Sequence, residues 1–239
     1  MCRAAEEAGL DAVGIADHCN VSTDDRQSRR KKAMGFNLDL TYERRHGGIE
    51  AVRESFDLRV FDAVEMDYEP DDEDAVREFL GEAGFEYAVG SVHVLDGVNV
   101  HVESHFAPKS EAERRDLVDR YFEKLVALAE SELFEIAAHP DIVERNPALR
   151  GLATEDHYRR AAEAFADSRT VPEINAGRAL GDYGRLHPND AFLDVLLEHG
   201  VGPTVGTDSH EPAEIEPRVK HVEAELEERG IEPVEVVGT

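Results

Sequence analysis

The sequence predicts an α/β barrel in which parallel strands are covered by helices. An initial helix is followed by six alternations of a short apolar strand with a helix, the pattern of a parallel sheet. Polar residues follow the C-terminal ends of these strands, where barrel enzymes carry their active sites. A doubly wound open sheet usually carries a Gly-rich phosphate loop, and the sequence has no such fingerprint. A barrel is therefore favoured over an open sheet.

The predicted elements follow from apolar periodicity and from the residues that end helices. Gly9, Gly84, Gly200 and Gly230 each stand within two residues of the end of a helical segment, where glycine commonly ends helices. The predicted helices cover residues 1–8, 41–56, 73–83, 110–131, 154–167, 189–198 and 213–229. The predicted strands cover residues 11–16, 59–65, 87–92, 134–138, 170–175 and the stretch that begins at Thr204.

Length and charge limit the classes of protein that fit. A chain of 239 residues with no long low-complexity break fits one domain over residues 1–239. The chain has 53 acidic and 26 basic residues, which gives a formal net charge of -27. This charge repels nucleic acid and anionic membranes, so we expect neither as a partner. An acid excess of this size is a means by which halophilic proteins adapt to salt, and we interpret it in that way.

The remaining composition indicates a cytoplasmic protein. Cys2 and Cys19 are too few for a disulfide framework or a thiolate zinc site, which suits a reducing compartment. The sequence has no run of about 18 apolar residues and no apolar signal-peptide core near its start. The basic run from Arg29 to Lys32 is interpreted as a solvated surface, with phosphate binding as the alternative. The sequence leaves the oligomeric state open.

Residues that suit metal binding recur at the strand ends. Imidazole and carboxylate groups together match zinc, manganese or iron, whereas magnesium alone prefers fewer histidines. Any one histidine at a strand end could instead be a hydrogen-bonded core residue, but the repetition at equivalent positions favours a shared site. The residues at these positions are His18, Glu65, His93, His139, Glu173 with Asn175, and Asp208 with His210.

The chemistry expected at such a site is hydrolysis. Asp208 and His210 stand two apart and point to the same side if strand pairing continues through them. Glu65 can bridge two metals through its two carboxylate oxygens, and multi-metal sites activate water while they clamp the oxygens of a phosphoryl group. We therefore expect Asp208, His210 and Glu65 to serve catalysis.

Other polar residues have weaker assignments. Arg178 and Arg145 follow strand ends and could bind a substrate phosphate, although surface arginines paired with acids are the alternative. Glu173 and Asn175 could orient the metal ligands. Two histidines, His101 and His105, lie in a loop that could fold over the barrel mouth. We expect ordinary surface or packing roles for His46, His157, His187, His199 and His221.

Six short motifs, taken in order, resemble those of the polymerase and histidinol phosphatase (PHP) superfamily. They are Ile15-Ala16-Asp17-His18, Val64-Glu65-Met66-Asp67-Tyr68, Gly90-Ser91-Val92-His93, Ala138-His139-Pro140-Asp141, Glu173-Ile174-Asn175 and Gly206-Thr207-Asp208-Ser209-His210. The Gly-Ser-Val-His and Glu-Ile-Asn elements look most like the histidinol-phosphatase branch. This resemblance implies a distorted seven-stranded (β/α) barrel whose trinuclear metal centre hydrolyses histidinol phosphate, a small phosphorylated substrate, in histidine biosynthesis.

The same resemblance implies up to three divalent ions of zinc, manganese or iron, with Glu65 bridging two of them. The implied ligands are His18, Glu65, His93, His139, Asp208 and His210. The family opens with a strand that bears a His-x-His motif, and this sequence has no counterpart of it. We therefore expect a barrel that lacks its first strand, truncated relative to the family, with a naturally depleted site as the alternative. Because of this departure, two further functions stay open: action on another small phosphoester, and a non-catalytic PHP-like module that binds metal or a partner.

Overall fold

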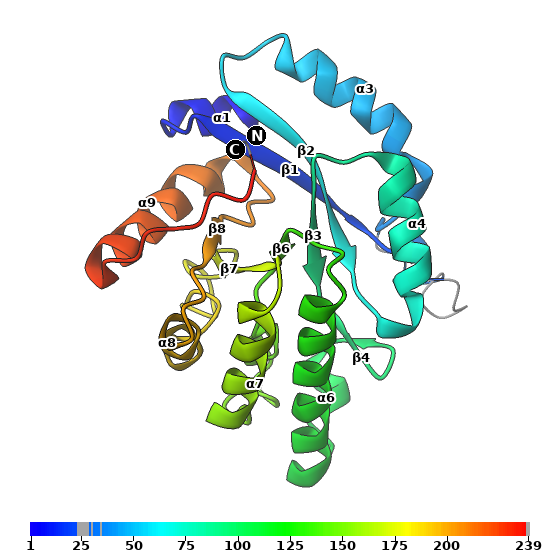
Figure 1. The fold of residues 1–239 in the computed structure, drawn as a ribbon, viewed down its shortest axis with the longest axis vertical. Helices are drawn as coiled ribbons and strands as arrows, with labels where there is room; N and C mark the ends of the chain where they lie inside the picture. Colours follow the sequence, from blue (N-terminus) through cyan, green and yellow to red (C-terminus); the bar gives the residue numbers. More distant parts are fainter. Residues whose placement is uncertain (23–28, 30, 34, 238–239) are drawn as a thin grey trace.

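Six parallel strands form one curved sheet whose order in space is the order in the chain. The computed structural model describes residues 1–22, 29, 31–33 and 35–237. The sheet runs β1-β2-β3-β6-β7-β8, and each strand pairs with the next in parallel (Figure 1). The strands are β1 Ala12–Cys19, β2 Arg59–Asp67, β3 Tyr87–Ser91, β6 Ile136–Ala137, β7 Val171–Asn175 and β8 Thr204–Gly206. The predicted parallel α/β architecture is confirmed.

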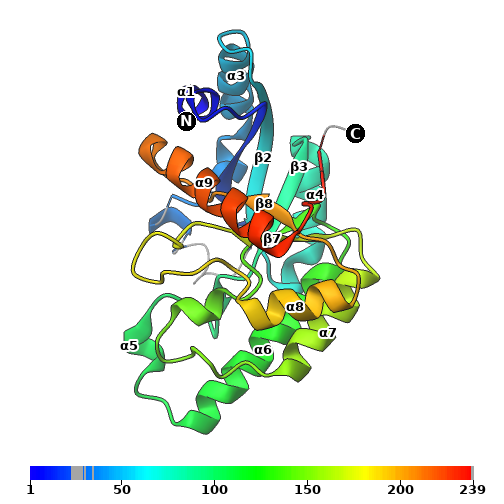
Figure 2. The ribbon, with the colours of Figure 1, turned by 90° about the vertical axis from the view of Figure 1, so that its left-hand side faces the viewer.

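The sheet is an open barrel with β1 and β8 at its edges. Within the described residues these two strands do not pair with each other. Helices α1 (Cys2–Glu7) and α9 (Pro212–Arg229) pack together beside the two edge strands (Figure 2). An apolar cluster that includes Cys2 and Ala5 of α1 and Ile215 and Val219 of α9 joins them. The two ends of the described chain are therefore held together by helix packing.

Helices cover the outer face of the sheet. Helix α6 packs against α7, and α7 packs against α8 (Figure 1). In α6 the buried residues recur at helical spacing, so that one apolar face meets the core. They are Leu117, Val118, Tyr121, Phe122, Leu125, Leu128 and Ala129. The other helices are α3 Tyr42–Arg53, α4 Glu73–Ala83, α5 Glu103–Phe106, α6 Glu111–Glu130, α7 Glu155–Ala166 and α8 Asp190–Glu198, with short 3-10 helices η1 Leu38–Leu40, η2 Pro70–Asp72 and η3 Ile142–Arg145.

Local signals in the sequence explain where several helices begin and end. The Ser110 hydroxyl accepts a hydrogen bond from the Glu113 backbone N–H, and the Glu113 carboxylate accepts one from the Ser110 N–H. Gly84 and Gly230 adopt left-handed conformations after α4 and α9, with φ of 67° and 65°. No described helix is both long and apolar enough to cross a membrane.

Three details differ from the predicted elements. Strand β1 continues to Cys19, because its pairing with β2 runs on through the polar residues Asp17 and His18. A hairpin of β4 (Val94–Leu95) and β5 (Val98–Asn99) follows β3, and its turn Asp96-Gly97 has positive φ at both residues. Strand β6 has only two residues, Ile136–Ala137, although the sequence predicted a strand over residues 134–138.

Candidate metal centre

The Glu65 carboxylate lies at the centre of three imidazoles. Its Oε2 atom is 3.6 Å from His18 Nδ1, and its Oε1 atom is 3.6 Å from His93 Nε2 and 3.4 Å from His139 Nε2. His18 of β1 and Glu65 of β2 are paired in the register of these two strands, while His93 and His139 follow β3 and β6. Four adjacent strands of the barrel thus bring these side chains together, as their positions at the strand ends predicted.

The lone pairs of this cluster fit a bound cation. One ligand atom each from His18, Glu65 and His93 lie within 4.8 Å of one another. Among the described residues, His18 Nδ1 and Glu65 Oε1 are buried and have no hydrogen-bond partner. Buried polar atoms in proteins are nearly always paired, so a nitrogen and an oxygen that are both buried without hydrogen-bond partners in one cluster fit a pair of metal-ligating atoms. Nitrogen and oxygen donors in this combination suit zinc, manganese or iron.

Electrostatics places both kinds of ligand in the form that binds metal. Burial alone would raise the pKa of Glu65, but the imidazoles of His18, His139 and His93 outweigh it and hold the pKa below its usual range. Burial lowers the pKa of His139 to about 4. At neutral pH Glu65 is therefore an anion and His139 a neutral imidazole, which are the protonation states that coordinate a divalent ion.

A further carboxylate orients His93. Its Nδ1 atom lies 2.7 Å from Asp67 Oδ1 and 3.1 Å from Ser91 Oγ, and Asp67 Oδ2 accepts a hydrogen bond of 3.1 Å from Asn20 Nδ2. A proton on Nδ1 of His93, donated to Asp67, leaves Nε2 as the lone pair that faces Glu65. We did not assign this role to Asp67 from the sequence, although its place two residues after Glu65, on the same face of β2, could have indicated it.

Glu173 and Asn175 of β7 support the neighbouring part of the site. Glu173 Oε2 accepts hydrogen bonds from the His139 backbone N–H at 3.3 Å and from Asn175 Nδ2 at 3.2 Å. Burial and the charge of Asp208 raise the pKa of Glu173 to about 8. Gly206 of β8 leaves room for this side chain, because a Cβ at that position would lie 1.5 Å from Glu173 Oε1.

Asp208 and His210 lie beside this cluster, but they do not belong to the group of His18, Glu65 and His93, whose ligand atoms lie within 4.8 Å of one another. Strand β8 ends at Gly206 and Asp208 has a φ of 47°, so strand pairing does not continue through the two residues and the condition for the expected same-side arrangement is not met. His210 Nδ1 lies 3.6 Å from Asp208 Oδ1, and the His210 ring is 6.3 Å from the His18 ring. The His210 side chain is 67% exposed. Asp208 Oδ2 lies 3.6 Å from Arg145 Nη2.

The two predicted phosphate-binding arginines occupy different environments. Arg145, at the end of η3, is nearly buried and donates from Nε to His187 Nε2 at 2.8 Å and from Nη2 to Asn175 Oδ1 at 3.1 Å. Arg178 is exposed, and no ion pair to it is found in the described part of the chain. Its positive charge acts on Arg145 and on His101, which places all three near one another.

The loop after β3 brings His101 to the mouth of the site. Desolvation of its ring by the surrounding protein and the nearby charge of Arg145 lower the pKa of His101 to about 3. His105 instead packs edge-on against Phe106 at 4.9 Å. In the basic run, Lys31 pairs with Asp39, while Arg30 lies outside the described residues.

Most of the remaining histidines have structural roles. His157 caps α7, and its Nε2 atom is 2.7 Å from Asp119. His46 contacts Asp62 and the Ala83 carbonyl, and His199 contacts the Val195 carbonyl at the end of α8. His187 instead belongs to the site, because it is fully buried and accepts a hydrogen bond from Arg145. Its place in a loop before α8 carried no sign of this contact.

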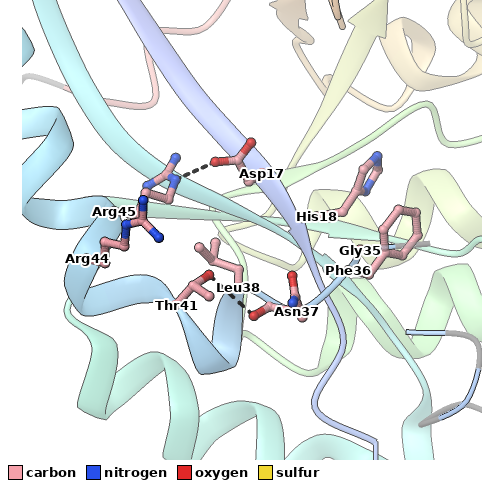
Figure 3. Close-up of a pocket in the computed structure, with 9 residues that line it drawn as sticks. All are labelled: Asp17, His18, Gly35, Phe36, Asn37, Leu38, Thr41, Arg44 and Arg45. Atoms are coloured by element: carbon pink, nitrogen blue, oxygen red, sulfur yellow. Dashed lines mark hydrogen bonds and ion pairs between the residues drawn. The ribbon is translucent and has the colours of Figure 1, made fainter. Parts of the chain in front are cut away.

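A cavity of about 520 Å³ opens beside His18 (Figure 3). The Phe36 ring stacks on the His18 imidazole with 4.3 Å between ring centroids. On the other side of the cavity, Arg45 pairs with Asp17 at 2.5 Å. The cavity is lined by Asp17, His18, Gly35, Phe36, Asn37, Leu38, Thr41, Arg44 and Arg45.

Comparison with known families decides the relationship of this chain. The family model described as PHP domain matches residues 1–177, most of the chain. The chain belongs to the PHP domain family. A Deinococcus radiodurans protein named "Probable histidinol-phosphatase" is 25% identical over 173 residues, which are 70% of this chain and 64% of that relative. The match thus spans less than two thirds of the relative's length.

Solved structures share the fold of this PHP domain. The histidinol phosphate phosphatase of Lactococcus lactis subsp. lactis Il1403, complexed with zinc, L-histidinol and phosphate, has a TM-score of 0.75 at 17% identity, over 97% of this chain and 87% of that one. A Listeria monocytogenes protein named for histidinol phosphatase has a TM-score of 0.71 at 18% identity, over 90% and 89% of the two chains. A chain in the structure of archaeal ribonuclease P with mature tRNA has a TM-score of 0.52 at 14% identity, over 89% of this chain and 71% of that one.

Proposed function

We propose that this PHP domain is a metal-dependent phosphomonoesterase that hydrolyses L-histidinol phosphate to histidinol and phosphate, a step of histidine biosynthesis. The observation that carries the proposal is the Glu65 carboxylate, which faces three imidazoles while its Oε1 atom has no hydrogen-bond partner among the described residues. The name of the Deinococcus radiodurans relative and the histidinol and phosphate held by the Lactococcus lactis structure support the choice of substrate.

The residues that would hold the metal surround Glu65, whose two oxygens face different imidazoles. Up to three ions of zinc, manganese or iron fit this donor set. When bound, such ions supply a nucleophile from water at neutral pH and neutralise the charge of a phosphoryl group. The proposed ligands are His18, Glu65, His93, His139, Asp208 and His210, of which Glu65, Asp208 and His210 would act in catalysis.

The positive side chains of the site would bind the substrate's phosphate. Arg145 and Arg178 lie near each other, and guanidinium groups bind phosphate oxygens through paired hydrogen bonds. His101 at the mouth would contact the organic part of the substrate. We place this enzyme in a salt-rich cytoplasm, because its net charge of -27 suits a halophilic protein and two free cysteines suit a reducing compartment.

The similarity to a chain of archaeal ribonuclease P raises the alternative of a non-catalytic module. That similarity concerns the fold, at 14% identity. The net charge of -27 opposes association with RNA, whose phosphates would be repelled. The clustered metal donors further favour an enzyme over a binding module.

Phosphate release from L-histidinol phosphate tests the proposal. The chain is loaded with manganese or zinc in high salt and compared with the same protein in chelator and with the His139→Gln variant. We expect release that needs the metal and is lost in His139→Gln, while the matched His199→Gln variant, altered at the end of α8, keeps it. Release from other small phosphomonoesters alone would refute the substrate, and no release from any of them would refute the enzyme.

A further inference from the structure

A buried carboxylate, an imidazole and a guanidinium form a continuous hydrogen-bonded series beside the metal centre. Asp141 Oδ1 contacts His187 Nδ1, and His187 Nε2 is 2.8 Å from Arg145 Nε. Both Asp141 and His187 are 0% exposed at their side chains. The Nη2 atom of Arg145 lies 3.1 Å from Asn175 Oδ1 and 3.6 Å from Asp208 Oδ2. The series therefore runs from the interior to the edge of the proposed active site.

The partners determine which nitrogen of His187 carries the proton. Arg145 Nε can only donate, so His187 Nε2 must be the acceptor and carries no hydrogen. The proton of the neutral ring then sits on Nδ1 and is donated to Asp141. The other oxygen of Asp141 accepts from the Asn189 backbone N–H and from Asn189 Nδ2, each at 2.8 Å. Asp141 thus acts only as an acceptor, and one tautomer of His187 satisfies the whole series.

The His187 ring has little freedom to move. Its backbone forms an isolated bridge with Asn175 of β7, through hydrogen bonds of 2.8 Å and 3.1 Å. Tyr183 stacks on the ring with 4.7 Å between centroids and 4° between planes. The imidazole is therefore held to the same strand that carries Asn175, the second acceptor for Arg145.

This arrangement fixes the orientation of the Arg145 guanidinium beside the site. Its Nε and Nη2 atoms donate to neutral groups, His187 and Asn175, and Nη2 also forms an ion pair with Asp208 Oδ2 at 3.6 Å, a separation too long for a hydrogen bond. Among the described residues no acceptor for a hydrogen bond from Arg145 Nη1 is found. A guanidinium that is fixed by neutral acceptors, with the Asp208 carboxylate too distant for a hydrogen bond, retains N–H donors for an anion.

We infer that His187 and Asp141 are positioning residues that hold the Arg145 guanidinium in place to bind the phosphate of the substrate. The inference rests on the proposed phosphomonoesterase function for the identity of the reaction. A purely structural role would make this series equivalent to the pair of His157 and Asp119, which joins the start of α7 to α6. That pair is the matched control.

Nitrogen-15 spectroscopy tests the geometry without any catalytic measurement. In the labelled protein we expect His187 to show a protonated Nδ1 and an unprotonated Nε2. A scalar coupling across the hydrogen bond from Arg145 Nε to His187 Nε2 is also expected. The Asp141→Asn variant would shift this tautomer, because an amide NH2 turned toward Nδ1 can only donate. A proton on Nε2 in the unaltered protein, or no coupling, would overturn the inference.

A double-mutant cycle tests whether His187 acts through Arg145. We expect His187→Leu to raise the KM for the phosphomonoester by roughly 10-fold to 100-fold, the range for residues that orient a functional group. His187→Gln, whose amide oxygen reaches about as far as Nε2, should restore part of the loss. In an Arg145→Ala background His187→Leu should add little, since coupled residues are not additive. His157→Leu should lower thermal stability and leave KM unchanged.

Binding of inorganic phosphate separates failure of this inference from failure of the proposed function. If the unaltered protein hydrolyses phosphomonoesters but the effects of His187→Leu and Arg145→Ala are additive, the inference is wrong and the function stands. If it hydrolyses none, the function is wrong, and the Kd of the metal-loaded protein for inorganic phosphate decides the inference. The inference is supported if His187→Leu raises this Kd by roughly 10-fold in the otherwise unaltered protein but not in the Arg145→Ala variant. An unchanged Kd in His187→Leu overturns the inference.

Discussion

Substitution of Gly206 by alanine should disturb the site from outside the set of proposed ligands. A Cβ at Gly206 would lie 1.5 Å from Glu173 Oε1 and 2.6 Å from Glu173 Cδ, far inside van der Waals contact. Glu173 is buried, so its side chain would have to rotate within a packed interior. The rotation would break its hydrogen bonds to the His139 backbone N–H and to Asn175 Nδ2.

The cost can be built from these contacts. The loss of two buried hydrogen bonds costs about 1 kcal/mol each, and displacement of a packed side chain costs about 1 to 3 kcal/mol. Replacing a strand glycine by alanine returns about 0.5 to 1 kcal/mol through the unfolded state. The net loss in the free energy of unfolding is about 2 to 4.5 kcal/mol, which for a chain of this length lowers Tm by roughly 4 to 18 °C.

Thermal unfolding followed by circular dichroism measures this change. Gly48→Ala is the matched control, because a Cβ there meets nothing within 4 Å and the residue lies inside α3. The control should gain about 0.5 to 1 kcal/mol. A Gly206→Ala protein with unaltered Tm would refute the close approach of β8 to Glu173. In the double variant with Gly206→Ala and Glu173→Ala, the side chain that the new Cβ would meet is absent. The effects of the two substitutions on Tm should therefore be strongly non-additive.

Two further predictions concern the metal centre and its pH dependence. Asp67→Asn should weaken binding of zinc or manganese by roughly 10-fold to 100-fold, because Asp67 holds the proton on His93 Nδ1; calorimetric affinity equal to that of the unaltered protein would show that this carboxylate does not orient His93. In chelator, Glu173→Gln should reduce the loss of stability between pH 5 and pH 8. The pKa of Glu173 is raised to about 8, so the folded state retains a proton that the unfolded state has released, and stability falls as pH rises by up to about 1.4 kcal/mol per pH unit. Urea unfolding at several pH values measures this slope, and equal slopes in the two proteins would contradict the assignment.

Local patterns in the sequence were sufficient to predict the elements and the end of the sheet that carries the polar residues. The glycine at Gly84 is recognised from its neighbours in the chain, and it ends α4 as predicted. The convergence of His18, Glu65, His93 and His139 also followed from the alternation, because parallel strands in chain order bring their C-terminal ends to one edge. The hairpin at Asp96-Gly97 was missed although its turn signal is local.

Contacts between segments distant in the chain were decided only by the tertiary structure. His187 and Asp141 are 46 residues apart, and nothing near either residue in the sequence indicates that they meet. Asp208 and His210 looked like a same-side pair at a strand end, but the chain leaves the strand at Gly206 because β8 loses its pairing with β7 there. Periodicity depends on forces within one segment, whereas burial, pKa shifts and hydrogen-bonded series depend on which segments pack together. The clustering of the imidazoles around Glu65 could therefore be predicted from the chain, while the contacts of Asp67, Asp141 and His187 became evident only in the assembled barrel.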